Sequence, residues 1–175
     1  DHAVLLHPVR PGFAVGVDDA IRAQLLGLQF GVHRQPRHAA ELFQLRLVDF
    51  AEPAARKFGA QSVGVEYNPK MADYARCKVQ EAGMTEKVRI ITGDIFVENF
   101  SSANVVTLYL LPDLNLRLRP TLLKMKPGTR IVSHAFNMGD WEPDETMSHE
   151  YSRGYFWVVP AQVEGDWMFS GMEGG

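Results

Sequence analysis

The most constraining feature of this sequence is a regular alternation of strand-like and helix-like segments that starts near Lys57. A short strand is expected within residues 60–67, where apolar residues alternate. Asn68 then caps a helix, and Pro69 suits the first helical position because an N–H is not needed there. Gly83 is expected to end this helix, since glycine readily adopts the left-handed backbone found at helix C-termini.

The alternation continues towards the C-terminus. The nearly continuous apolar run at 104–111 predicts a buried parallel strand. Further segments predict a strand ending at Gly93, a helix over 114–126 that is interrupted or bent near Pro120, a strand within 127–136, and two strands within 155–169 joined at 164–166. This order predicts an α/β fold with a mostly parallel sheet that ends in a C-terminal antiparallel hairpin.

The N-terminal third differs in kind from the rest. Among residues 1–56 every lysine-or-arginine position is arginine, and the first lysine is Lys57. Residues 18–30 have helical spacing, whereas 40–50 fit either a strand or a helix that Pro53 would end. We expect one domain over 1–175, in which 1–56 is an atypical segment and 57–169 is the recognisable core.

Composition narrows the possible classes of protein. The chain has 175 residues, 46% of them hydrophobic, and a net charge of -3, which does not indicate a nucleic-acid or membrane-surface partner. Cys77 is the single cysteine, which excludes an intrachain disulfide and a cysteine zinc cluster and favours a cytoplasmic location. His33 and His38 have no carboxylate or thiolate partner in register, so no metal site is expected. The chain also lacks a long apolar run and a signal peptide.

Polar residues stand where the predicted parallel strands end, which is where open sheets bind ligands. Glu66 follows the first of these strands, and its carboxylate can accept two hydrogen bonds from a ribose diol. Gly93 and Asp94 follow the next strand, where the carboxylate and the following backbone N–H can bind the edge of an adenine. Together these positions describe an adenosine pocket.

Two further strand ends carry candidates with bland alternatives. Tyr109 is either a core residue of its apolar strand or an active-site residue. His134 is either a general base or a hydrogen-bonded structural histidine. Trp141 either covers a substrate pocket or plugs the sheet edge. The basic run over 117–130 and the acidic segment 140–150 are either solvated surfaces that face each other or, for the basic run, a docking face for an acidic partner.

The ordered set of Glu66, Gly93-Asp94, "LYLLP" and "KPGTRIVSHAFNMGDWEPD" resembles class I S-adenosylmethionine-dependent methyltransferases. More narrowly, it is similar to a bacterial group related to mitochondrial protein-lysine methyltransferases. The resemblance runs from about Ala55 to Trp167 and implies a Rossmann-like methyltransferase fold. It also implies S-adenosylmethionine as cofactor and a methyl acceptor that is a protein lysine or another amine.

The resemblance also implies roles for individual residues. Glu66 would bind the ribose hydroxyls, Asp94 the adenine amino group, and Ile95 would flank the ring. Tyr67 and Gly93 complete the expected cofactor contacts on this part of the chain. The turn "YLLP" would border the methyl group and its acceptor, with Tyr109 as the candidate catalytic residue.

The chain departs from this family at one place. The family has an acidic residue and a glycine-rich turn after its first strand, whereas this chain has "VDFAEPAARKFG". Asp49 stands where the family's acid would stand, but glycines that let the backbone approach a cofactor are missing. Residues 1–56 therefore form a rebuilt wall, damage the pocket, or replace the family's segment. The alternative function is a non-catalytic binding protein of methyltransferase fold with a degenerate cofactor site.

Overall fold

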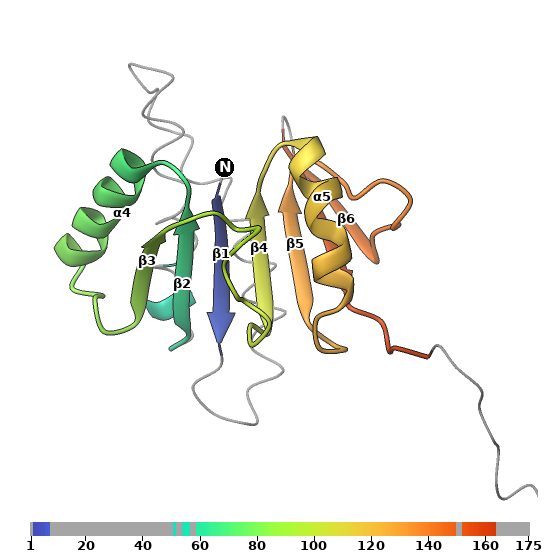
Figure 1. Ribbon diagram of the computed structural model, residues 1–175, viewed down its shortest axis with the longest axis horizontal. Coiled ribbons are helices and arrows are strands. Elements are labelled where there is room, and N and C mark those ends of the chain that lie inside the picture. The colour runs from blue at the N-terminus through green and yellow to red at the C-terminus, as the bar shows by residue number, and fades with distance from the viewer. Residues whose placement is uncertain (1, 8–50, 52–53, 57–58, 150–151, 164–175) are drawn as a thin grey trace, which may run out of the picture.

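The computed structural model describes residues 2–7, 51, 54–56, 59–149 and 152–163. The seven strands of this part of the chain form one sheet in the order β3-β2-β1-β4-β5-β7-β6 (Figure 1). They are β1 (His2–His7), β2 (Gln61–Glu66), β3 (Val88–Thr92), β4 (Val105–Tyr109), β5 (Arg130–His134), β6 (Glu145–His149) and β7 (Ser152–Val158). The helices α4 (Pro69–Glu81) and α5 (Pro112–Leu123) follow β2 and β4. The α/β class is therefore confirmed.

The sheet is mixed rather than mostly parallel. β2 pairs with β3 in parallel, as β4 does with β5, whereas β1 is antiparallel to both of its neighbours and β7 is antiparallel to β5 and β6. The prediction was wrong because β1 lies outside the strand–helix alternation on which it rested. Since β1 reverses direction between β2 and β4, the strands β2 to β5 still point the same way. Their carboxyl ends meet at one edge (Figure 1).

The connection from β2 to α4 follows the predicted local chemistry. Asn68 has an extended backbone, and its side-chain oxygen accepts from the N–H groups of Lys70 and Met71 at 3.0 and 3.4 Å. Pro69 is the first helical residue. Gly83 follows the helix with a φ of +66°, where a Cβ would be strained, so the predicted cap and stop are both confirmed.

The helix α5 begins earlier than expected and is not interrupted. It starts at Pro112, two residues before the predicted start, and continues through Pro120. Proline at position 120 removes one backbone donor from the helix. Leu118 and Leu122 bury one face of this helix against the sheet, which compensates for that loss.

The antiparallel hairpin lies one segment earlier than predicted. It joins β6 to β7, and Val159 to Val163 form no strand. β6 was expected to be an acidic loop because Met147 is its single apolar residue, too few for an alternating pattern to be visible. Pro160 follows soon after β7 and cannot donate to a strand ladder. The proposed turn at 164–166 lies outside the described residues.

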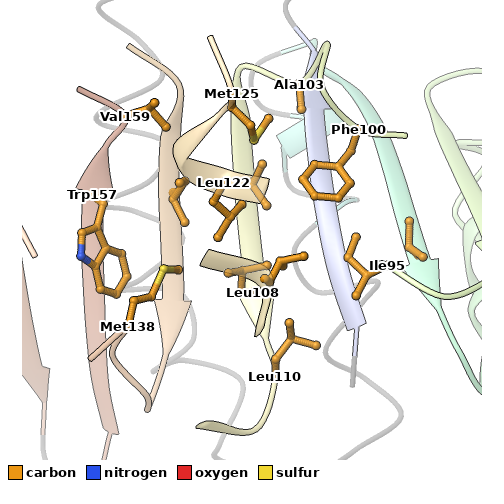
Figure 2. Close-up of a cluster of buried hydrophobic side chains, with 14 residues drawn as sticks. Ile95, Phe100, Ala103, Leu108, Leu110, Leu122, Met125, Met138, Trp157 and Val159 are labelled. Atoms are coloured by element: carbon orange, nitrogen blue, oxygen red, sulfur yellow. The ribbon is translucent and has the colours of Figure 1, made fainter. Parts of the chain in front are cut away.

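Two apolar clusters cover opposite faces of the sheet. In β4 the alternation of side chains sends Val105 to one cluster and Val106 and Leu108 to the other. Alanines and a valine of α4 complete the first cluster. The second is shown in Figure 2, where Leu122 of α5 lies over Leu108 and where Trp157 and Met138 close one end. Burial of these side chains fixes the strand ends that carry the polar candidates.

The predicted helix end before β2 is present. Residues 54–56 are helical, and Gly59 follows with a φ of +67°. The N–H of Gly59 donates to the carbonyl of Ala55 at 3.1 Å, and the N–H of Ala60 donates to that of Ala54 at 3.4 Å. The helical pattern at 18–30, the ambiguous 40–50 and Asp49 lie outside the described residues. No helix in the described part of the chain has the length and apolar character needed to cross a membrane.

Candidate functional site

Glu66 is the last residue of β2 and lies at the edge where the parallel strands end. It is buried, with 5% of its surface exposed. Its Oε1 accepts a hydrogen bond from the backbone N–H of Asn68 at 2.8 Å. The start of α4 therefore holds this carboxylate through the backbone, and the helix N-terminus nearby favours a negative charge there.

Asp94 stands at the corresponding place after β3, and a tight turn fixes it. Its Oδ1 accepts from the N–H of Phe96 at 2.9 Å, while its backbone carbonyl accepts from Val97 and Glu98 at 2.9 and 3.0 Å. Gly93 precedes it, and an added Cβ at Gly93 would lie 2.5 Å from Oε1 of Glu98. A side chain at position 93 would thus displace Glu98, so the close approach favours glycine.

One cavity of about 350 Å³ joins these two positions. Its walls are Val65, Glu66, Tyr67, Asn68, Gly93, Asp94, Ile95, Phe96, Leu110, Leu114 and Arg117. Two carboxylates and several apolar side chains therefore line one volume, which suits a ligand with hydroxyl or amino donors on a flat apolar body. Tyr67 is 71% exposed and forms part of the rim, whereas Ile95 is buried.

The structure brings together five of the six predicted cofactor residues: Glu66, Tyr67, Gly93, Asp94 and Ile95. The sixth, Asp49, lies outside the described residues. Sequence reasoning missed the cavity's opposite wall, where the guanidinium of Arg117 lies 4.1 Å from the ring centroid of Phe96. The three-residue spacing of Leu114 and Arg117, just after "YLLP", was the signal that could have found it, because it puts both side chains on one helix face.

The middle of the sheet meets this edge in an unusual way. In the antiparallel register His2 lies opposite both Glu66 and Tyr109, while His7 lies opposite Gln61. β1 therefore brings its N-terminal end to the edge with the cavity. Its carboxyl end lies at the other edge, so the connection that leaves β1 does not begin beside Glu66.

Tyr109 and His134 are not among the cavity's lining residues but lie side by side at the same edge. Their ring centroids are 4.8 Å apart and their planes are inclined by 29°, an offset stack. Both side chains are half-buried and end neighbouring parallel strands, β4 and β5. This arrangement joins two candidates that the sequence treated separately.

The basic and acidic segments do meet, as one of the sequence interpretations expected. Arg119 of α5 pairs with the carboxylate of Asp140 and also donates to the carbonyl of Met138 at 2.8 Å. The guanidinium hydrogen bond holds the pKa of the Asp140 carboxyl below its ordinary value of 3.8. Trp141 packs on Trp157 with a centroid distance of 5.9 Å, and its carbonyl accepts from the indole N–H of Trp157 at 2.9 Å. Trp141 thus lies against the second apolar cluster.

Comparison with known proteins places this geometry in a family. Residues 47–145, more than half of the chain, match the family model described as the ANTKMT methyltransferase domain. A protein-lysine N-methyltransferase from Saccharolobus islandicus (strain REY15A) is 39% identical over 99 residues, which cover 55% of this chain and 62% of that protein. A lysine N-methyltransferase for ATP synthase from Xenopus laevis is 28% identical over 92 residues, which cover 52% of this chain and 41% of that protein. The chain thus spans less than two thirds of both.

A solved structure extends the similarity over most of the chain. It is an RNA methyltransferase from Salinibacter ruber in complex with S-adenosyl-L-homocysteine, with 37% sequence identity and a TM-score of 0.63. The similarity covers 75% of this chain and 97% of that one. These comparisons confirm the resemblance drawn from Glu66, Gly93-Asp94 and the later motifs.

Proposed function

Because the chain belongs to the family of the ANTKMT methyltransferase domain, we propose that it transfers the methyl group of S-adenosylmethionine to a protein lysine. The observation that carries this proposal is the shared cavity of Glu66 and Asp94, at the ends of two adjacent parallel strands. The protein-lysine methyltransferase from Saccharolobus islandicus supports the choice of acceptor.

The residues present suit the adenosine part of this cofactor. The buried carboxylate of Glu66 is an acceptor for both hydroxyls of a ribose, and Asp94 is an acceptor for the amino group of adenine. Ile95 and Leu110 supply apolar surface for the ring. Arg117, lying on Phe96, closes the wall that faces the two carboxylates. Each of these roles follows from donor and acceptor chemistry and is part of the proposal.

The protein's task in the reaction is chiefly one of alignment. S-adenosylmethionine, when bound, supplies a methyl carbon already activated by its sulfonium group. The chain must then hold a neutral amine in line with that carbon and keep water away. We assign the acceptor side to the strand ends of β4 and β5, where Tyr109 and His134 stack. Their half-buried rings would border the amine, and neither needs to change its charge.

One observation favours a second candidate, a non-catalytic binding protein of the same fold. The family's first strand ends in a turn that approaches the cofactor, whereas β1 here ends at the opposite edge of the sheet. In that case the cavity at Glu66 and Asp94 would bind a nucleoside without positioning its methyl group. Binding without transfer is the result that this alternative predicts.

Methyl transfer is tested with cofactor labelled in its methyl group and a cell extract as the source of acceptors. The proposal predicts label in methyl-lysine after hydrolysis of the protein fraction. The variant Asp94→Ala is expected to lose the transfer, while Asp73→Ala, which alters an exposed carboxylate on α4, is expected to keep it. Label that ribonuclease removes would instead identify RNA as the acceptor. Binding of the cofactor without any transfer would favour the non-catalytic candidate.

A further inference from the structure

The carboxyl end of β5 turns sharply at a strained residue. Ala135 has a φ of +68°, in the left-handed region where the Cβ of an L-residue is crowded. The N–H of Phe136 donates to the carbonyl of His134 at 2.9 Å, which closes a three-residue turn around Ala135. The N–H of Ala135 donates to the carbonyl of Arg153 at 2.7 Å. Such strain persists only where the surroundings hold it.

One buried side chain of α5 holds this turn. Asn115 is fully buried, and its Nδ2 donates to Ser133 Oγ at 2.9 Å and to the carbonyl of Phe136 at 3.1 Å. These two acceptors lie on either side of Ala135, so the amide group spans the strained residue. The carbonyl of Asn137 lies a further 3.5 Å from the same nitrogen. The amide thereby favours the turn over an extended continuation of β5.

The orientation of this amide is determined by its partners. The carbonyls of Phe136 and Asn137 accept but cannot donate, so the NH₂ group must face the turn. Asn115 Oδ1 consequently points elsewhere and accepts no hydrogen bond from the residues that the structure describes. A buried acceptor without a partner is costly. The bonds to the turn are therefore made in spite of an unsatisfied oxygen on the same group.

The turn sets the position of His134. Its ring stacks on Tyr109 at 4.8 Å, and Tyr109 ends the strand that leads into α5 through Leu111. Asn115 thus closes a loop of contacts from β4 through α5 to the end of β5. A relaxed Ala135 would alter the backbone next to His134 and with it the geometry of the ring pair.

We infer that Asn115 is a positioning residue, which holds the strained turn at Ala135 and so fixes His134 against Tyr109. Its meaning for catalysis rests on the proposed function, because the ring pair would border the acceptor amine. The mechanical part of the inference does not depend on any activity. It predicts that the Tyr109–His134 pair responds to changes at position 115.

The direct test is the NMR spectrum of protein labelled in its histidine rings. The Tyr109 ring is expected to shift the His134 imidazole signals, and the variant Tyr109→Leu identifies this shift by removing it. Asn115→Ala is expected to move the His134 signals most of the way to the Tyr109→Leu positions. Gln162→Ala is the matched control, since its amide anchors the other end of α5 by donating to the carbonyl of Leu123 at 2.9 Å. It is expected to leave the His134 signals unchanged.

Glycine at position 135 provides a rescue. In Ala135→Gly the left-handed turn carries no Cβ strain, and we expect the folding equilibrium constant to rise by about fivefold. Because the turn then needs less support, Asn115→Ala should move the His134 signals much less in this background. Equal displacement in both backgrounds, or wild-type His134 signals in a folded Asn115→Ala protein, would overturn the inference. Should Asn115→Ala fail to fold, the milder Asn115→Ser is measured against the same two outcomes.

Calorimetry with S-adenosylhomocysteine separates this inference from the proposed function. Asn115 does not line the cavity of Glu66 and Asp94. The Asn115→Ala and wild-type dissociation constants are therefore expected to agree within about twofold. An unbound wild-type protein would overturn the cofactor proposal while the NMR result still decides the role of Asn115. A large loss of affinity in Asn115→Ala alone would contradict a role confined to the acceptor side.

Discussion

The backbone N–H of Gly93 donates to the carbonyl oxygen of Glu66 at 3.0 Å, immediately beyond the last paired residues of β2 and β3. The two carboxylates of the candidate site belong to Glu66 itself and to Asp94, the residue after Gly93. Their spacing is therefore set by a continuous strand ladder and not by flexible side chains. A site held in this way loses little conformational freedom when a ligand binds.

The contact between Gly93 and Glu98 predicts a specific coupling. In Gly93→Ala the new Cβ would lie 2.5 Å from Glu98 Oε1, so the Glu98 side chain must swing away. We expect a loss of about 1 kcal/mol in the free energy of unfolding, because the displaced atoms are the end of a flexible side chain. Adding Glu98→Ala should remove most of that loss. Urea unfolding of the four proteins measures it, and additive losses would show that the two residues do not interact.

The ion pair of Arg119 and Asp140 predicts a pH dependence in the acid range. The pKa of Asp140 is lowered in the folded protein, chiefly by the hydrogen bond from Arg119, so the unfolded chain binds this proton more readily. The pair's contribution to stability is therefore present above the ordinary value of 3.8 and is lost as the pH falls through the folded pKa. An NMR titration of the Asp140 carboxyl should show the lowered pKa. It should return towards the ordinary value in Arg119→Gln, and an unchanged titration would contradict the pairing.

The central place of β1 predicts sensitivity to proline. Val4 pairs with Gly64 on one side and Thr107 on the other, so the ladder has no free edge at this position. Proline there leaves a buried carbonyl without a donor, and we expect Val4→Pro to lose about 1–3 kcal/mol or more of stability. Val163→Pro is the control, because Val163 is 64% exposed and lies outside the strands. Equal thermal midpoints for the two variants would mean that β1 does not lie at the centre of the sheet.

Much of the core was predictable from the sequence, for identifiable physical reasons. The cap at Asn68 and the stop at Gly83 depend on contacts within a few residues, so the local sequence was sufficient. Glu66 and Asp94 could be expected in one cavity because the carboxyl ends of parallel strands meet at one edge. Family motifs at the same positions pointed the same way.

The elements that were missed depend on distant partners. β1 pairs with strands more than fifty residues away in the chain, and no short pattern announces its direction. β6 forms because β7 offers it an edge, although Met147 is its single apolar residue. Asn115 contributes through a turn twenty residues later, and nothing near it in the sequence marks it. Such long-range contacts lie beyond periodicity and capping rules.

The most direct test of the cofactor site is a calorimetric titration with S-adenosylhomocysteine, comparing wild-type protein with Glu66→Gln. Glutamine keeps an oxygen for the N–H of Asn68 but removes the charge that would bind the ribose hydroxyls. Glu86→Gln, at an exposed position before β3, is the control.

We predict saturable binding to the wild type and to Glu86→Gln, and a dissociation constant about 10- to 100-fold weaker for Glu66→Gln. A folded wild-type protein that binds no S-adenosylhomocysteine, or a Glu66→Gln variant that binds it as tightly as the wild type, would contradict the assignment of this cavity to the cofactor.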